Sequence, residues 1–271
     1  MPTHRLDALV VQKGLATGRD QAKAYILAGQ ITVNGQRVDK AGAMVEETAE
    51  LAFTGHANPY VSRGGLKLIK ALEAFQIDLA GKRVLDLGAS TGGFTDCALQ
   101  RGACHVVAVD VGYGQLAWSL RNDSRVTVLE RTNARYLKSG LVGEAVDFIS
   151  ADLSFISLTK IIPVLPSLLK PGGELVLLVK PQFEAGREQV GKKGVVKDPA
   201  VHIEVIARVA DCARDHGLIP INLDFSPITG PEGNIEYLLH LALAAEAAAD
   251  FSTQIAQTVA KAHQSLQPVR R

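Results

Sequence analysis

Residues 83–94, RVLDLGASTGGF, decide the fold class of this 271-residue chain. A short apolar run leads directly into a turn of small residues, with glycines at 88, 92 and 93, and a helical pattern begins after the turn. A strand that passes through such a turn into a helix is the first unit of a doubly wound α/β sheet, where free backbone N–H groups at the helix start face a ligand. We therefore expect an α/β sheet with a ligand site at this turn.

The alternation of strand and helix patterns continues along the chain from residue 60 onward. Further strands are predicted at 105–110, 126–129, 146–152, 174–180 (introduced by the turn 170–173), 221–225 and 234–241. A long helix near 199–216 precedes the last two strands, and their short connection indicates a hairpin, so that one strand runs antiparallel. Seven strands that end in this way are typical of a class I (Rossmann-like) methyltransferase, whereas a dehydrogenase sheet is usually all parallel.

The first 59 residues have a different pattern and are expected to form a separate small α+β unit. Leu6, Leu9 and Val10 share one face of a first helix, a second helix follows near 19–30, and Asn34-Gly35 predicts a tight hairpin. This order of elements, with basic residues spread along it, resembles the S4 RNA-binding fold, although a purely structural cap stays open. The expected domains are an S4-like unit over 1–59, a methyltransferase domain over 60–243 and a C-terminal helix and tail over 244–271.

Composition and charge limit the class of protein. Hydrophobic residues make up 47% of the chain, and 29 Lys and Arg against 28 Asp and Glu give a net charge of +1. No apolar run reaches about 18 residues, and the first residues lack the apolar core of a signal peptide. Three cysteines provide no disulfide framework and the seven histidines have no metal-ligand spacing. We expect a cytoplasmic, monomeric protein without a metal.

The glycine turn and two polar residues indicate an adenosine-containing cofactor. Asp110 closes the second strand of the sheet, where a carboxylate can accept hydrogen bonds from ribose hydroxyls, and Asn133 follows the third strand, where its amide can meet an adenine edge. The turn lacks the G-x-G-x-x-G spacing, which favours S-adenosyl-L-methionine over a dinucleotide, with a purely structural turn as the alternative. The candidate cofactor residues are Asp86, Gly88, Ser90, Thr91, Gly92, Gly93, Phe94, Asp110, Asn133 and Asp152.

The end of the fourth strand, ADLSF at 151–155, indicates which group would accept a methyl group. It lacks the Asn/Asp-Pro-Pro-aromatic motif of amine methylation, and no cysteine is near it for cytosine C5 chemistry, so an alcohol acceptor is left. A ribose hydroxyl needs a base, and Lys180, at the end of the fifth strand, is expected opposite Asp152. Burial, a second cation such as Lys67 and a nearby sulfonium would lower the pKa of that lysine. Glu236 is an acid in an apolar run and should be paired if it is buried.

Lys67, Asp152, Lys180 and Glu236 match the Lys-Asp-Lys-Glu tetrad of the FtsJ-type ribose 2′-O-methyltransferases. Behind the S4-like unit, the stretches VSRGGLKL, LDLGASTGGFTD, ADLSFISL, VKPQFE and GNIEYLL resemble the TlyA family, which is also labelled hemolysin A. Thr91 stands where the FtsJ turn usually has proline, a TlyA-like departure.

The resemblance implies methylation of cytidine 2′-hydroxyls in 16S or 23S ribosomal RNA, or in both, within ribosomal subunits. It also implies that Lys180 accepts or steers the hydroxyl proton, that Asp152 and Glu236 orient and tune the lysines, and that Lys67 positions the ribose. The candidate RNA contacts are Arg5, Arg19, Lys23, Arg37, Arg63, Lys192 and Lys193.

Several other interpretations are open at this point. A membrane-active hemolysin is the alternative from another class, and an NAD-dependent enzyme and an RNA-binding protein with an inactive methyltransferase domain are further ones. Residues 181–200 are expected to form a long loop without regular structure that acts as a lid on RNA, or a solvated surface loop. Trp118 is expected to pack against the cofactor pocket or the core rather than to stack on bases. The tail after residue 243 is expected to form a packing helix over 244–266.

Overall fold

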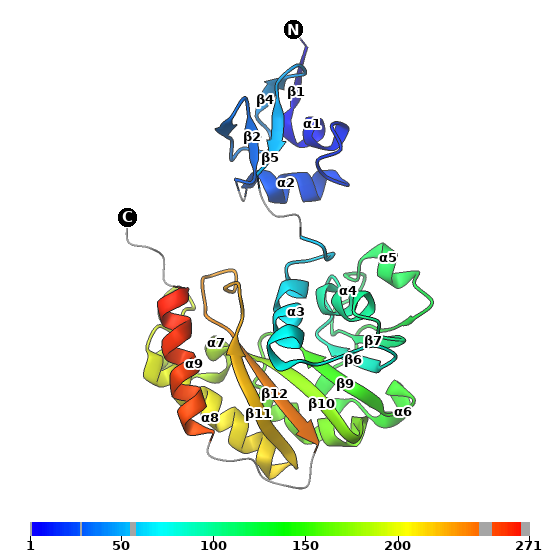
Figure 1. Cartoon of the computed structure of the whole chain (residues 1–271), viewed down its shortest axis with the longest axis vertical. Coiled ribbons are helices and arrows are strands. Elements are labelled where there is room, and N and C mark those ends of the chain that lie inside the picture. Colours follow the sequence, from blue (N-terminus) through cyan, green and yellow to red (C-terminus); the bar gives the residue numbers. More distant parts are fainter. Residues whose placement is uncertain (1, 28, 55–57, 244–250, 267–271) are drawn as a thin grey trace. The chain divides into compact units, whose positions relative to one another are not determined.

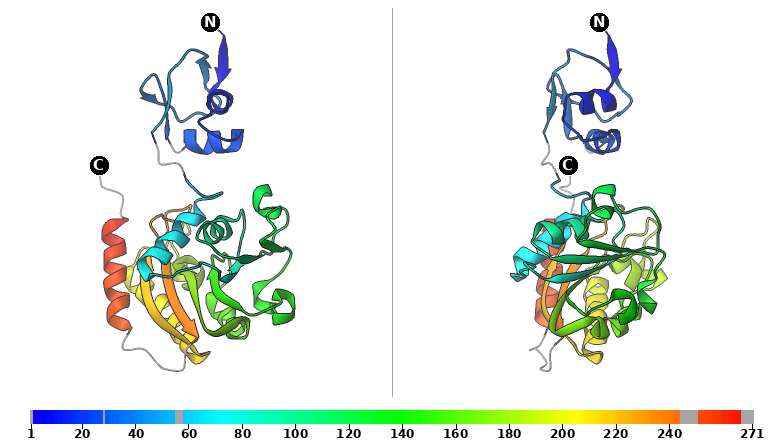
Figure 2. Two further views of the ribbon diagram at one scale, coloured as in Figure 1. Left: turned by 45° about the vertical axis from the view of Figure 1, so that its right-hand side comes forward. Right: turned by 90° about the vertical axis from the view of Figure 1, so that its right-hand side faces the viewer.

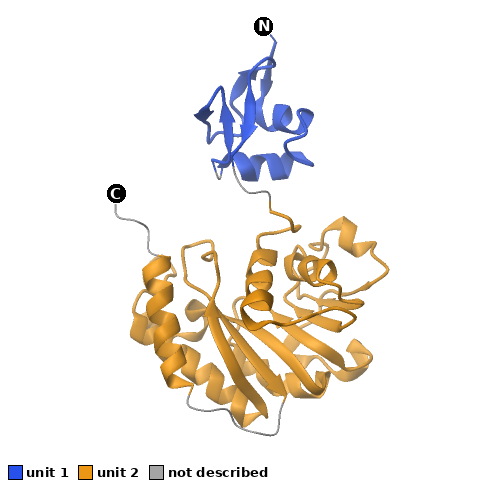
Figure 3. Ribbon diagram, in the orientation of Figure 1, with its two compact units in different colours: residues 1–57 blue, residues 58–271 orange. Residues whose placement is uncertain are grey.

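The computed structural model describes residues 2–27, 29–54, 58–243 and 251–266. The chain divides into two compact units, residues 1–57 and residues 58–271, which Figure 3 shows in two colours. Each unit has its own hydrophobic core, and each is described separately below.

The N-terminal unit is a small α+β fold around two helices. Its elements are β1 (Thr3–Arg5), α1 (Leu6–Gln12), α2 (Arg19–Leu27), β2 (Ile31–Val33), β3 (Gln36–Arg37), β4 (Met44–Glu46) and β5 (Leu51–Phe53). Strand β2 lies between β3 and β5, and both neighbours run antiparallel to it. Asn34 and Gly35 have φ values of 51° and 78°, as the predicted hairpin turn requires.

The second unit contains a seven-stranded mixed sheet (Figure 1). Its strands are β6 (Arg83–Leu87), β7 (His105–Val109), β8 (Val126–Leu129), β9 (Val146–Ala151), β10 (Leu169–Val179), β11 (Leu218–Phe225) and β12 (Tyr237–Leu243). The order across the sheet is β11-β12-β10-β9-β6-β7-β8, and β12 runs antiparallel to both of its neighbours. This confirms the predicted class I methyltransferase sheet with its terminal hairpin.

Both faces of this sheet are buried under helices (Figure 2). The helices of the unit are α3 (Gly64–Phe75), α4 (Gly93–Gln100), α5 (Trp118–Arg121), α6 (Ser139–Val142), α7 (Pro181–Glu184), α8 (Pro199–Asp215) and α9 (Ser252–Ser265). Short 3₁₀ helices are η1 (Ala134–Tyr136), η2 (Leu158–Lys160), η3 (Ile162–Leu168) and η4 (Arg187–Gln189). Helices α3 and α4 share a core with Val84 and Val176, whereas α8 and α9 share one with Leu85 and Leu175. Burial on both faces explains why these strands are apolar runs rather than alternating patterns.

The structure corrects some expected boundaries. Strand β10 begins at Leu169 and includes the predicted turn 170–173 as an irregularity in its pairing with β9. The C-terminal helix is α9, which packs on α8 and β11 through Ile255 and Val259, whereas residues 244–250 of the expected helix lie outside the described residues. None of the helices that the structure describes combines the length and the apolar character that crossing a bilayer requires.

Candidate active site

The glycine turn after β6 is held between the carboxyl ends of its two neighbouring strands. The N–H groups of Gly88 and Ala89 donate to the carbonyl of Val109, and the N–H of Asp152 donates to the carbonyl of Leu87. Gly88 has a φ of 84°, and a Cβ atom there would lie 2.5 Å from the carbonyl oxygen of Asp152. Glycine is therefore required at this position because the backbones of two strands approach each other closely.

Asp110 connects this turn to the loop after β7. Its Oδ2 accepts a hydrogen bond from the N–H of Ser90 at 2.8 Å, and its Oδ1 accepts one from the N–H of Gly112 at 2.7 Å. After β8, Asn133 caps the start of η1, and its Oδ1 accepts from the N–H of Arg135 at 3.0 Å. Both side chains are thereby fixed by local backbone at the carboxyl edge of the sheet.

Two cavities of about 520 Å³ each lie at this edge. Five of the predicted cofactor residues line the first cavity: Gly88, Ser90, Asp110, Asn133 and Asp152. Eight predicted residues line the second: Arg63, Lys67, Gly88, Ser90, Thr91, Gly93, Phe94 and Asp152. Gly88, Ser90 and Asp152 belong to both linings, so the two cavities adjoin at the end of β9.

Lys67, Asp152, Lys180 and Glu236 form one ionic cluster beside these cavities. Lys180 Nζ lies 2.6 Å from Asp152 Oδ1, and Lys67 Nζ lies 3.4 Å from Asp152 Oδ2. Lys67 Nζ also lies 2.7 Å from Glu236 Oε2, as an ion pair without the alignment of a hydrogen bond. The four side chains come from α3, the end of β9, the end of β10 and the residue before β12. The arrangement is a chain in which acids and amines alternate.

The surroundings of the cluster determine its charge state. Burial by itself would lower the pKa of Lys67, but the carboxylates of Asp152 and Glu236 outweigh this effect and raise the pKa above its ordinary value. Lys67 is therefore held as a cation. Glu236 and Lys180 are buried, with 2% and 6% of their surface exposed, and each lies against an ionisable partner of the opposite type, as a buried ionisable group requires.

Two predicted cofactor residues line neither cavity. Asp86 is fully buried beneath the turn, where it accepts hydrogen bonds from Thr95 Oγ1 at 2.7 Å and Ser150 Oγ at 3.2 Å. Burial raises the pKa of this carboxyl to about 7. Gly92, with a φ of 101°, faces the side chains of Leu116 and Leu120. Both residues shape the turn from the side of the protein core.

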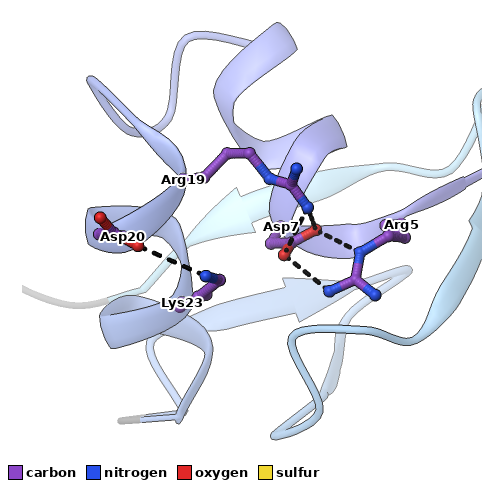
Figure 4. A network of polar contacts seen from close by, with 5 residues as sticks. All are labelled: Arg5, Asp7, Arg19, Asp20 and Lys23. Carbon is purple, nitrogen blue, oxygen red and sulfur yellow. Dashed lines mark hydrogen bonds and ion pairs between the residues drawn. The ribbon is translucent and has the colours of Figure 1, made fainter.

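Two of the basic residues predicted for RNA in the N-terminal unit, Arg5 and Arg19, bind a buried carboxylate (Figure 4). Asp7 is fully buried and accepts from Arg5 Nη2 at 2.9 Å and from Arg19 Nη2 at 3.2 Å. The hydrogen bond from Arg5 is the main reason that the pKa of Asp7 is lowered to about 2. The side chains of Arg5 and Arg19 stay 51% and 57% exposed, so their guanidinium groups are fixed in place at the surface.

The other predicted RNA contacts have varied surroundings. Lys23 pairs with Asp20 at 3.4 Å, and the Arg37 side chain lies against Gly29. In the second unit, Lys192 and Lys193 line a further cavity of about 910 Å³.

Residues 181–200 do not form the expected structureless loop. They contain α7 and η4, and Glu184 is buried, accepting from Ser157 Oγ at 2.6 Å and from the N–H of Leu158 at 2.7 Å. Nearer Lys192 and Lys193, Asn234 accepts from the N–H of Val196 at 3.1 Å and donates to the carbonyl of Gly194 at 2.8 Å. The prediction was wrong because the polar, glycine-rich composition of residues 181–200 does not indicate hydrogen-bond partners that lie outside the segment.

The sequence interpretation also missed residues that the structure brings to the site. Ser154 Oγ accepts from Lys180 Nζ at 3.0 Å and lines the first cavity. Phe155 lines the same cavity with 92% of its surface exposed and a φ of 62°, which is rare for a non-glycine residue. The only available signal was their position directly after Asp152. Trp118, expected to pack inward, is 76% exposed.

The comparisons with known proteins agree with this geometry. A family model described as FtsJ-like methyltransferase matches residues 60–243. The chain belongs to the FtsJ-like methyltransferase family. In this methyltransferase an S4 domain model matches residues 4–51 as well.

Curated relatives and a solved structure resemble this FtsJ-like methyltransferase over most of its length. It is 51% identical to the 16S/23S rRNA (cytidine-2'-O)-methyltransferase TlyA of Mycobacterium tuberculosis, over 88% of this chain and 89% of the relative. It is 41% identical to Hemolysin A of Brachyspira hyodysenteriae, over 87% of this chain and 98% of the relative. A solved Streptococcus thermophilus protein with a provisional hemolysin name has a TM-score of 0.79 and 46% identity, covering 98% of this chain and 97% of that one.

Proposed function

We propose that this FtsJ-like methyltransferase transfers a methyl group from S-adenosyl-L-methionine to the ribose 2′-hydroxyl of cytidines in 16S ribosomal RNA, 23S ribosomal RNA or both. The observation that carries the proposal is the position of Asp152, which lines both cavities and holds Lys67 and Lys180. A donor in one cavity and an acceptor in the other would meet beside two amines. The substrate class is the one named for the TlyA relative of Mycobacterium tuberculosis.

The residues around the first cavity fit the cofactor. Asp110 uses one lone pair of each oxygen on backbone N–H groups, which leaves acceptor positions for the ribose hydroxyls. The Nδ2 group of Asn133 can donate to an adenine edge, because only its Oδ1 is used by the N–H of Arg135. The volume of about 520 Å³ lies within the usual range of small-molecule sites. When bound, the cofactor supplies an electrophilic methyl group on a sulfonium.

Different roles follow for the two lysines from their surroundings. Lys67 has its pKa raised between two carboxylates, so it acts as a hydrogen-bond donor that positions the ribose oxygen. Lys180 is anchored by Asp152 and Ser154, and its Nζ accepts or steers the proton of the 2′-hydroxyl as the oxygen takes the methyl group. Glu236 keeps Lys67 in place. Fixing these groups before the reaction supplies most of the rate through alignment.

The test replaces Lys180 with alanine. We expect Lys180→Ala to abolish 2′-O-methylation, mapped by primer extension on ribosomal subunits, with the calorimetric affinity for S-adenosyl-L-methionine nearly unchanged. Lys170→Ala is the matched control, because Lys170 pairs with Asp147 at 2.8 Å at the opposite end of the same two strands. Retained turnover with a lost cofactor affinity would refute the role of Lys180.

Residues 1–59 are proposed to bind structured RNA, with Arg5 and Arg19 as the fixed guanidinium donors. The substrate would be ribosomal subunits in the cytoplasm, met by a monomeric enzyme. Residues 60–243 would carry out the chemistry, and α9 would pack against them. No specific observation favours membrane lysis, and leakage of liposomes without the cofactor would be the result that supports it.

A further inference from the structure

Besides Phe155, large aromatic side chains in the segments that follow β7 and β8 are exposed at the carboxyl edge of the sheet. Tyr113 is 68% exposed, Trp118 is 76% exposed and Tyr136 is 66% exposed. They follow β7 and β8, at the same edge as the two cavities. We call these three residues, with Arg131 and Arg135, the aromatic rim. Exposed aromatic side chains gathered in one region of a surface indicate an interaction site.

Arginines lie over two of the three rings. The guanidinium carbon of Arg131 is 4.4 Å from the centre of the Tyr113 ring, and that of Arg135 is 5.5 Å from the centre of the Tyr136 ring. Arg131 has a φ of 52°, a strained value for arginine, and its N–H donates to the carbonyl of Gly112. The rim therefore combines flat apolar surfaces with positive charge that does not depend on pH.

Glu130 holds the parts of the rim together. Its Oε1 accepts from the N–H of Gly114 at 2.7 Å and pairs with Arg121 of α5. The N–H of Ala117, directly before Trp118, donates to the carbonyl of Thr91 in the glycine turn at 3.0 Å. Trp118 is thus placed by α5 and the glycine turn together, although its ring is exposed.

The rim is continuous with the first cavity. Arg131 and Arg135 flank the segment 132–134 in the sequence. All three residues of that segment line the first cavity, as does Asp152. Asp152 also lines the second cavity, where the acceptor is proposed, so a strand bound on the rim would run past the cofactor cavity to reach the acceptor site.

We propose that the aromatic rim binds unpaired bases of the RNA strand that carries the target ribose. The proposal rests on the proposed function. Aromatic rings and guanidinium planes stack on the faces of unpaired bases of any sequence, whereas bases in a duplex are covered by their neighbours. Arg131 and Arg135 also complement the phosphate charge of such a strand.

The first experiment uses the fluorescence of Trp118, which is the single tryptophan of the chain. A single-stranded oligocytidine added to the full-length protein should quench the Trp118 fluorescence and shield the ring from further quenching by iodide. The same oligonucleotide paired into a duplex should have neither effect. The Lys180→Ala variant should show the same quenching, because stacking does not require the chemistry. Quenching by S-adenosyl-L-methionine alone would overturn the proposal, since Trp118 would then cover the cofactor.

The second experiment measures substrate affinity. Trp118→Ala and Tyr113→Ala should each raise the KM for ribosomal RNA by about 5- to 150-fold, the range for loss of one stacked base, with an unchanged affinity for S-adenosyl-L-methionine. Trp118→Phe should restore most of the affinity. Leu141→Ala is the matched control, because Leu141 is 57% exposed on α6, which precedes β9 and so lies at the opposite edge of the sheet.

The outcomes separate this proposal from the proposed function. Quenching by single-stranded RNA together with an absence of methylation would refute the function and support the rim. Normal methylation with an unchanged KM in Trp118→Ala and Tyr113→Ala would refute the rim and leave the function intact. Quenching that appears only with ribosomal proteins, and not with naked RNA, would also overturn the proposal, because the partner would then be a protein.

Discussion

Replacing Asp86 with asparagine should stabilise the protein at neutral and alkaline pH and have little effect near pH 4. The Asp86 carboxyl has its pKa raised to about 7, chiefly by burial and against the hydrogen bonds from Thr95 and Ser150. In the unfolded chain an aspartate titrates near pH 4. The native state therefore holds a proton that the unfolded state loses between about pH 4 and pH 7, and stability falls as pH rises through that range.

The magnitude follows from the size of the pKa shift. About three pKa units, each worth roughly 1.4 kcal/mol, make the full loss about 4 kcal/mol above pH 7. Roughly 3 kcal/mol of this should appear between pH 5 and pH 8. Asparagine cannot ionise, and its amide has nearly the same shape, so Asp86→Asn avoids the loss. The advantage of the variant should thus grow with pH.

Urea unfolding followed by circular dichroism at a series of pH values measures this difference. Asp147→Asn is the control, because the pKa of Asp147, on the same sheet, is lowered. Burial would raise this pKa, but Lys170 and the N–H of Arg83 outweigh the effect of burial. Relative to the wild type, that variant should lose stability as pH rises to about 4 and stay level above it, so it should lack the gain expected for Asp86→Asn between pH 5 and pH 8. A pH-independent effect of Asp86→Asn would refute the reasoning, and a large loss of cofactor affinity would show a direct contact with the cofactor instead.

Three further predictions concern buried polar groups. Asp7→Ala should lower the free energy of unfolding of the N-terminal unit by about 2 kcal/mol in thermal melts, because two charge-assisted hydrogen bonds are lost. The pKa of Asp7 in the wild type is about 2, so this stabilisation should be present above about pH 4 and should decline as pH falls toward 2. Glu184→Ala should cost about 1–3 kcal/mol in urea unfolding, since a buried N–H of η2 loses its acceptor, while the exposed Glu188→Ala should not. Tyr237→Phe should cost about 1 kcal/mol by the same measurement, because its hydroxyl lies 2.7 Å from buried His202.

The strands could be predicted because burial on both faces leaves an unbroken apolar run in the sequence. The end of each run then placed Asp152 and Lys180 at one edge of the sheet, so the proximity of these two residues followed from the fold class. Lys67 and Glu236 needed the family resemblance as well, because one lies on a helix and the other lies just before an antiparallel strand.

The features that could not be predicted depend on contacts between distant residues. Asp7 looks like a surface acid in the sequence, and its complete burial depends on Arg19, which approaches from another helix, as well as on the nearby Arg5. Trp118 and Phe155 have the apolar character of core residues, and hydrophobicity does not distinguish a ring that packs inside from one that faces solvent. The structure of residues 181–200 likewise depends on Ser157 and Asn234, which lie outside that segment.

The order of the strands has a consequence for biosynthesis. Strand β12, the last strand of the sheet to be translated, lies between β10 and β11 and directly follows Glu236. A nascent chain that ends before residue 236 leaves β11 without its neighbour and Lys67 without Glu236. Such incomplete products cannot assemble the full set of charged groups, so methyl-transfer competence would arise only once the C-terminal part of the domain has been made.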